Sequence, residues 1–168
     1  MRFFQLSRSL RSLALVAGAS VLALSLAGGA EARRSAGSGC TRSNVYWSHA
    51  IDDPAWDSVI PDGPYTIFFL SGRNYQQMLT DSTHQSPYNE LALDYIAATL
   101  NVYAGASMPS DVLVAFIDAQ SLFMSYAPTY DFITDPDGVT ADFEGLRSIL
   151  ALYNSGKLGP GACSSKKR

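Results

Sequence analysis

Apolar side chains recur at steps of three and four residues in three stretches of the second half of the chain, a spacing typical of one buried face of an α-helix. The stretches run from Ser86 to about Gly105, from Ser110 or Asp111 to about Tyr126, and from about Thr140 to Asn154. The positions expected to face inward are Leu93, Ile96, Leu100 and Tyr103, widened by Ala92, Tyr95, Thr99 and Val102, in the first helix; Leu113, Phe116, Ile117, Gln120 and Phe123 in the second; and Leu146, Ile149, Leu150 and Tyr153 in the third.

Local chemistry marks the ends of the first of these helices. Ser86 suits the N-cap, Pro87 suits the first helical position, and Glu90 places negative charge in the first turn. Gly105 favours the left-handed conformation in which many helices end. Because only five residues separate this helix from the next, we expect the two to pack antiparallel.

The first half of the domain is less regular. Residues 43–64 show little periodicity and predict an irregular cap that carries aromatic side chains, or a short helix around Trp56. The apolar run of residues 65–70 fits either a short buried strand or the start of a buried helix. Residues 74–80 predict a short helix with Tyr75, Met78 and Leu79 facing inward. The expected fold class is therefore mostly α, a small helical bundle with an irregular aromatic N-terminal cap.

Residues 1–32 have the features of a secretory signal peptide. Arg2, Arg8 and Arg11 precede a fourteen-residue apolar stretch at positions 13–26, and Ala30-Glu31-Ala32 fits the small-x-small cleavage rule. The alternative is an uncleaved anchor, but the apolar stretch is shorter than the about 20 residues that a bilayer needs. We therefore expect an exported protein, periplasmic or extracellular, with no integral membrane anchor once the signal is removed.

Composition and charge limit what the exported part can be. The chain has 168 residues, of which 47% are hydrophobic and 16% charged, and this leaves room for one small domain. We divide the exported part into a flexible leader (33–39), a single domain (40–163) and a basic tail (164–168). Between the two cysteines fourteen acidic residues face four basic ones, namely Arg42, Arg73, Arg147 and Lys157. An acidic body of this kind repels both nucleic acid and anionic lipid.

The five remaining basic residues of the exported part lie outside the cysteines: Arg33, Arg34, Lys166, Lys167 and Arg168. Short charged ends of this kind are usually solvated, and contact with an anionic surface is the alternative.

Cys40 and Cys163 are the only cysteines. In an exported chain they predict one disulfide that joins the two ends of the domain. No second cysteine lies near either of them in a C-x-x-C arrangement, so we expect a structural bond rather than a redox-active one. In the chain-entropy model a loop of this size is worth roughly 4–5 kcal/mol of stability.

Candidate catalytic groups are few. His84 lies in a polar turn, whereas His49 follows Tyr46-Trp47 and has Asp52, Asp53 and Asp57 close behind it in the sequence. A histidine beside a carboxylate could serve general acid–base chemistry in a cell-envelope hydrolase. The chain contains no G-x-S-x-G, H-E-x-x-H, phosphate-binding or dinucleotide-binding motif. We therefore favour a non-catalytic protein and expect no cofactor.

An acidic segment offers calcium as a further alternative. The segment contains Asp131, Asp135, Asp137, Asp142 and Glu144. Asp-x-Asp-Gly at residues 135–138 resembles the start of an EF-hand loop, but the fifth and twelfth positions of such a loop are Val139 and Leu146, which offer no side-chain oxygen. A turn followed by an acid-rich helix N-terminus explains the same residues by capping alone.

The aromatic residues of the irregular cap are the leading binding candidates. Tyr46, Trp47 and Trp56 could present ring faces to a polysaccharide or to a partner protein. The alternative is that these rings cover the helix bundle. The first interpretation requires Trp47 or Trp56 to be exposed on one connected patch.

Several motifs together resemble a group of secreted bacterial domains that opens G-C-T-x-(T/S)-x-G-Y-W-K-x-H and closes Y-N-x-G-x-x-G-P-G-x-C. The matching residues, which span about residues 39–163, are Gly39-Cys40-Thr41, Tyr46-Trp47, Phe69-Leu70-Ser71-Gly72, the run from Ile96 to Val102, Gly105-Ala106-Ser107, Tyr153-Asn154, Gly156, Gly159-Pro160-Gly161 and Cys163. The group has no established activity, so the resemblance implies export, a single domain and a disulfide between its ends.

The chain departs from that pattern where chemistry would be sought. The group's glycine before Tyr-Trp is Val45 here, its lysine is Ser48 and its histidine is Ala50, with His49 displaced by one position. If the lysine and histidine of the group form a site, this chain has lost or reshaped it. The leading expectation is a non-catalytic, exported or surface-associated module that binds envelope polysaccharide or a surface protein; the alternatives are the hydrolase and a calcium-stabilised domain.

Overall fold

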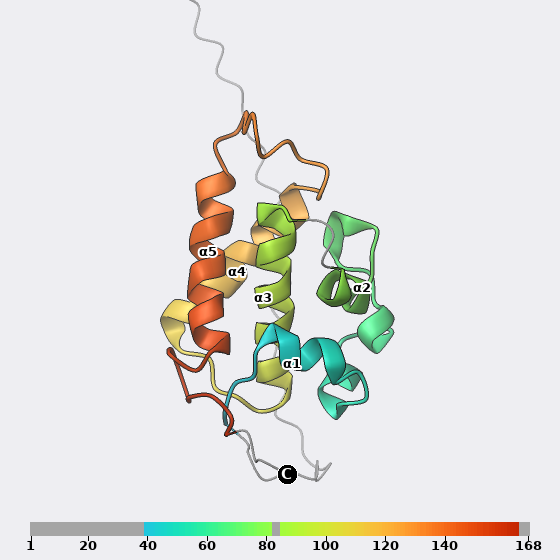
Figure 1. The fold of residues 1–168 in the computed structure, drawn as a ribbon, viewed down its shortest axis with the longest axis vertical. Helices are drawn as coiled ribbons and strands as arrows, with labels where there is room; N and C mark the ends of the chain where they lie inside the picture. Colours follow the sequence, from blue (N-terminus) through green and yellow to red (C-terminus); the bar gives the residue numbers. More distant parts are fainter. Residues whose placement is uncertain (1–38, 82–84, 165–168) are drawn as a thin grey trace, which may run out of the picture. The chain divides into compact units, whose positions relative to one another are not determined.

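The structure, a computed structural model, describes residues 39–81 and 85–164 (Figure 1). Helices in this part are α1 (Asn44–His49), α2 (Tyr75–Thr80), α3 (Pro87–Tyr103), α4 (Ser110–Ser125) and α5 (Thr140–Asn154), with the 3₁₀ turns η1 (Pro54–Ser58), η2 (Gly63–Tyr65) and η3 (Phe69–Ser71). The predicted helical bundle with an irregular N-terminal cap is confirmed. The predicted signal peptide, nearly all of the leader, His84 and most of the basic tail lie outside the described residues.

Helix α3 is the centre of the bundle. Figure 1 shows α5 and α2 on opposite sides of it, α1 in front of its lower part and α4 crossing behind, and contacts join α3 to all four. The predicted inward stripe is therefore too narrow, because residues 94–101 of α3 are buried all the way round. The stripe also extends too far, since Val102 and Tyr103 at the end of the helix are exposed. The two ends of α3 are as predicted: the Ser86 side chain accepts from the Asn89 N–H, and Gly105 has a φ of 94°.

Helix α4 turns a different face to the core than its spacing predicts. Its buried residues are Val112, Ala115, Ala119 and Phe123, whereas Leu113 and Ile117 are 46% and 51% exposed. Phe123 is buried, as predicted. Phe116 is partly buried, and its ring stacks on that of Tyr95 with the ring centroids 4.3 Å apart. The alanines explain the difference, because small side chains allow the α4 backbone to approach the core closely. The larger apolar residues of this helix then remain outside.

An aromatic cluster fills the space between α3, α4 and η3. The Phe68 ring lies at its centre, with the rings of Phe69, Tyr75, Tyr88, Tyr95 and Phe123 at centroid distances of 4.8–6.4 Å. Residues 65–70 form neither the strand nor the helix that we expected, since they consist of the end of η2, an isolated bridge residue and the start of η3. Only Phe68 of this run is fully buried. The short helix after it is confirmed as α2, with Met78 and Leu79 buried.

The two ends of the domain are joined. Cys40 and Cys163 form the predicted disulfide, with their Cα atoms 4.9 Å apart. Beside it, the Thr41 N–H donates to the Gly161 carbonyl and the Cys163 N–H donates to the Thr41 carbonyl, each at 2.9 Å. Gly156, with a φ of 75°, permits this return, because a Cβ atom there would collide with the backbone of Gly161 and Ala162.

Two buried asparagines connect the N-terminal segment to α3 and α5. The Asn101 side-chain oxygen accepts from the Trp47 indole N–H at 3.1 Å and from the Arg42 backbone N–H at 2.8 Å. The Asn101 amide donates to the Asn154 side-chain oxygen at 3.0 Å, and the Asn154 amide donates to the Asp94 carbonyl at 2.8 Å. Buried polar groups that satisfy one another in this way specify a single arrangement of the segments that carry them.

Among the residues that the structure describes, no helix is both long and apolar enough to cross a lipid bilayer.

Candidate functional site

The candidate catalytic residues are not brought together. The exposed His49 ring has its Nδ1 atom 2.8 Å from the Val45 carbonyl oxygen and 3.0 Å from the Ser48 hydroxyl. Asp53 accepts from the Ala55 N–H and thereby caps η1. Within the described ranges no hydrogen bond or ion pair joins His49 to Asp52, Asp53 or Asp57. The general acid–base pair that the hydrolase interpretation requires is therefore not formed.

The aromatic side chains of the cap do not form a binding face. Trp47 and Trp56 are each only 1% exposed, and their indole N–H groups donate inward, to Asn101 Oδ1 and to the Ala50 carbonyl. Tyr46 is partly buried and packs its ring edge-on against Trp47. The prediction that Trp47 and Trp56 offer ring faces to a ligand is wrong. Burying two large rings gives a small domain core area that its helices alone do not supply.

The acidic segment before α5 is a capping turn rather than a calcium loop. Asp131 accepts from the Ile133 and Thr134 N–H groups and from the Thr134 hydroxyl, and these hydrogen bonds lower the pKa of its carboxyl. Asp135 accepts from the Val139 and Thr140 N–H groups at the start of α5. Partial desolvation raises the pKa of Asp135, but those hydrogen bonds outweigh it, so the pKa is lowered.

Asp137, Asp142 and Glu144 do not join these two carboxylates around a common point. In the described part of the chain, no three His, Cys, Asp or Glu side chains lie close enough together to hold a metal ion. Asp135 instead satisfies N–H groups at the start of α5, and Asp131 satisfies those of the turn before it. The calcium interpretation is therefore not supported by the geometry.

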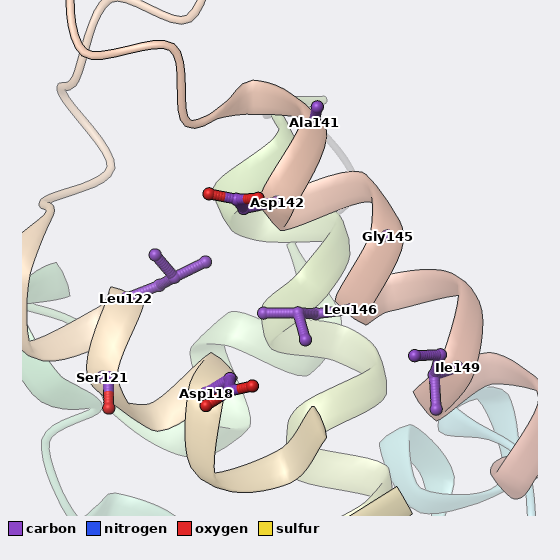
Figure 2. A pocket seen from close by; sticks show the side chains of 8 residues that line it. All are labelled: Asp118, Ser121, Leu122, Ala141, Asp142, Gly145, Leu146 and Ile149. Atoms are coloured by element: carbon purple, nitrogen blue, oxygen red, sulfur yellow. The ribbon is translucent and has the colours of Figure 1, made fainter. Parts of the chain in front are cut away.

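The structure does bring together residues of α4 and α5 around an open groove (Figure 2). The groove has a volume of about 560 Å³. Its lining residues are Asp118, Ser121 and Leu122 from α4 and Ala141, Asp142, Gly145, Leu146 and Ile149 from α5. None of these eight residues was among our candidate site residues except Asp142, which we had assigned to calcium.

The groove combines an apolar floor with two carboxylates. Leu122, Leu146 and Ile149 are partly buried and form the apolar part of the lining. Gly145 widens the groove, because no heavy atom lies within 4 Å of the position that a Cβ atom would take there. Figure 2 shows Asp118 on the α4 wall and Asp142 on the α5 wall. Among the described residues neither carboxylate has a hydrogen-bond or ion-pair partner.

Basic side chains are missing from both walls. Helix α4 contains Asp111 and Asp118 and no Lys or Arg. Helix α5 contains one basic residue, Arg147, whose Nη1 atom lies 2.8 Å from a carboxylate oxygen of Glu90 on α3. Arg147 thus forms its ion pair on the side of α5 that faces α3. The groove is consequently anionic as well as apolar.

Sequence reasoning missed the groove because both of its walls look like ordinary helix surface. One signal in the sequence points toward it. Helix α5 has a glycine in its interior, Gly145, where glycine costs about 1 kcal/mol relative to alanine.

Comparisons of the chain with models of protein families, with curated proteins and with solved structures found no match.

Proposed function

We propose that this protein is an exported, non-catalytic binding module that takes a segment of a partner protein into the groove between α4 and α5. The observation that carries the proposal is the groove itself: an apolar floor bounded by the carboxylates of Asp118 and Asp142, with no basic side chain to neutralise them. The dispersed positions of His49 and the carboxylates near it favour binding over catalysis. The disulfide supports export, because such bonds persist in oxidising compartments.

The chemistry of the groove selects a cationic amphipathic helix as its occupant. Two packed helices present a channel that a third helix fits, with apolar side chains at every third or fourth position against the floor. Lysine or arginine side chains at the edges of that helix would meet Asp118 on one wall and Asp142 on the other. Gly145 lies between, where an approaching helix finds space instead of a side chain.

A designed peptide provides a direct test. The probe is a helical peptide with leucine on one face and lysine on the other, and its partner probe carries glutamate at every lysine position. Titration followed by NMR of the ¹⁵N-labelled protein should show the lysine peptide perturbing amides of residues 118–122 and 141–149, and the glutamate peptide leaving them unchanged. Isothermal titration calorimetry gives the affinities.

Variants locate the binding. Gly145→Leu fills the groove at a position with free space and should weaken binding of the lysine peptide at least tenfold, whereas Gly145→Ala tests the change in helix propensity without the bulk. Asp118→Asn combined with Asp142→Asn should weaken binding about 2- to 10-fold at low salt, the range of two exposed ion pairs. Asp52→Asn with Asp57→Asn makes the same change in net charge elsewhere. Equal effects of the two double variants, or no effect of Gly145→Leu, would contradict the proposal.

A further inference from the structure

We propose that this protein forms a reversible, two-fold symmetric dimer through the solvent-facing side of helix α4. The proposal rests on the composition of this helix, on the spacing of its exposed side chains and on where its charges lie. The groove between α4 and α5 lies on another side of the same helix and plays no part in it.

Helix α4 lacks the charged outer face that surface helices usually have. Its two charged residues, Asp111 and Asp118, are seven residues apart and therefore lie on one side, that of the groove that Asp118 lines. The side that packs on the core consists of Val112, Ala115, Ala119 and Phe123. The remaining side, which faces solvent, carries large apolar residues and no charge. Helices whose outer face is also apolar are normally covered by another element, so we expect a partner on this one.

The exposed residues of α4 have the spacing of a contact seam between two helices. They form one stripe at steps of four, three and four residues, namely Leu113, Ile117, Gln120 and Met124. Leu113 and Ile117 are about half exposed and Met124 is 60% exposed, with Val114 beside the stripe at 58%. We call the stripe together with Val114 the α4 seam. None of its five residues is charged.

A second copy of the chain is the occupant that the charge distribution favours. A symmetric contact places a surface against itself, so any charge in it would face its own sign. Between the two cysteines the chain has fourteen acidic residues and four basic ones, and an acidic surface is unsuited to such a contact. The α4 seam avoids this repulsion because it is neutral as well as apolar. A cationic partner, in contrast to one in the groove, would find no carboxylate in the α4 seam to pair with.

An antiparallel pair of α4 helices brings the α4 seam into register with itself. With a two-fold axis between residues 118 and 119, Leu113 lies opposite the partner's Met124 and Ile117 lies opposite the partner's Gln120, and symmetry repeats both pairs. The two Ile117 side chains are then offset by about 4.5 Å along the helices, whose axes pack about 8–10 Å apart. Ile117 is therefore close to its own copy, which makes the symmetric arrangement testable by charge.

The area of the α4 seam predicts reversible association. Its four large apolar residues leave roughly 400 Å² exposed per copy, about half of the roughly 800 Å² per partner that a standard stable interface buries. Interfaces of this size are typical of transient complexes, so we expect a dissociation constant on the order of 100 μM. In unfolding experiments at about 2 μM the protein is then monomeric, so substitutions on α4 report on the fold alone.

Sedimentation velocity over about 10 μM to 1 mM tests the dimer. The protein is used in its oxidised form from Arg33 onward, a single compact unit. We expect the sedimentation coefficient to rise with concentration from the value of a monomer toward that of a dimer. Raising the salt concentration about tenfold should strengthen the association, because salt screens the repulsion between two acidic bodies and leaves an apolar contact intact. Association that salt weakens would indicate an ionic contact and would overturn the proposal.

Charge substitutions at Ile117 test both the surface and its symmetry. Ile117→Arg and Ile117→Glu each place like charges near the two-fold axis, so each variant alone should associate at least tenfold more weakly than the parent. A mixture of the two variants brings opposite charges together and should associate about fivefold more tightly than either variant alone. Ile133→Arg makes the same substitution at an isoleucine that is 96% exposed on the loop before α5, and it should leave the dimer unchanged.

A protein that stays monomeric up to about 1 mM, or association that survives Ile117→Arg, would overturn the proposal. A mixture that associates no more tightly than its two components would also overturn it, because the two Ile117 side chains would then not lie near each other. Gly145→Leu should not change the sedimentation, and Ile117→Arg should not change binding of the lysine peptide to the groove. The dimer and the groove can therefore fail independently.

Discussion

At the scale of single residues, the strictest steric requirement in the domain is at Gly156. Its φ of 75° and the backbone of residues 161–162, with which a Cβ atom there would collide, each exclude a side chain. Gly105 is the matched position, since its φ is 94° but no atom lies near the place of its missing Cβ. Gly105→Ala should therefore cost about 1–2 kcal/mol in the free energy of unfolding, the cost of the left-handed conformation alone. Gly156→Ala should cost clearly more, on the order of 3 kcal/mol. If urea unfolding gives equal losses of stability for Gly105→Ala and Gly156→Ala, the backbone of residues 161–162 does not pack closely against Gly156.

Tyr88 provides a substitution that we expect to stabilise the protein. Its side chain is fully buried among aromatic rings, and its hydroxyl has no hydrogen-bond partner among the described residues. Burial raises the pKa of this hydroxyl, which keeps it neutral throughout the physiological range. Tyr88→Phe retains the ring and removes the unsatisfied group, so the free energy of unfolding should rise by about 1 kcal/mol. A loss of stability on urea unfolding would mean that the hydroxyl has a partner in solution, such as a bound water.

Asp94 makes stability depend on pH. Burial raises the pKa of its carboxyl above 3.8; the hydrogen bond from Asn154 and the charge of Arg147 lower it, and the charge of Glu90 raises it further. A raised pKa in the folded state means that folding favours the protonated acid. This contribution is complete below pH 3.8 and is lost as the pH rises through the raised value. Asp94→Asn removes that loss, so the stability of the variant relative to the parent should increase as the pH rises above 3.8. A difference in unfolding free energy that does not change with pH would refute the assignment.

At the scale of elements, the boundaries of α2, α3 and α5 were predictable, but α1 was not predicted and α4 begins after Pro109 without the side-chain cap expected at Ser110 or Asp111. The faces of the helices were less predictable. The ends of α2 and α3 are set by residues within one turn of them, such as the reciprocal hydrogen bonds of Asn74 and Gln77 at the start of α2. The face of α4 depends on what lies opposite it. Val112, Leu113, Val114, Phe116 and Ile117 surround more than one side of this helix, so periodicity could not choose among them. The groove was beyond prediction for the same reason, because it exists only where α4 and α5 meet.

The orientation of α4 has a measurable consequence. Ala119 is fully buried, so Ala119→Leu should lower the free energy of unfolding by about 1–3 kcal/mol through overpacking. Leu113→Gln and Ile117→Gln, at positions that the spacing places inside the core, should each change stability by no more than about 0.5 kcal/mol. Urea unfolding of the three variants tests the orientation. If Leu113→Gln and Ile117→Gln cost more stability than Ala119→Leu, the inward face of α4 would be the one that periodicity predicts.

At the scale of the whole molecule, residues of the sequence motifs form contacts that close the domain. Trp47, Asn101 and Asn154 form the buried polar chain, and Cys40, Gly156 and Cys163 form the junction of the two ends. The disulfide could be predicted from the sequence because two cysteines allow only one pairing within the chain. The buried state of Trp47 could not, because a partner for its indole N–H comes from a residue 54 positions away.

Closure by several contacts predicts how the protein responds when the disulfide is removed. In the chain-entropy model, a bond between residues 123 positions apart is worth about 4–5 kcal/mol. The hydrogen bonds between Thr41 and residues 161–163, and those of Asn101, do not depend on the sulfur atoms. Cys40→Ala with Cys163→Ala should therefore lower the free energy of unfolding by about 4 kcal/mol and still give a native circular dichroism spectrum in the absence of denaturant.

Adding Asn101→Ala to that variant makes the test sharper. This substitution leaves the Trp47 indole N–H and the Arg42 N–H without their shared acceptor, so we expect a further loss of about 2–3 kcal/mol and detachment of the N-terminal segment. Trp47 fluorescence reports that detachment, since the emission maximum of a buried indole moves to longer wavelength when the ring is exposed to water. Retained Trp47 burial in the triple variant would show that packing of the indole against the core, and not the junction of the two ends, holds this segment in place.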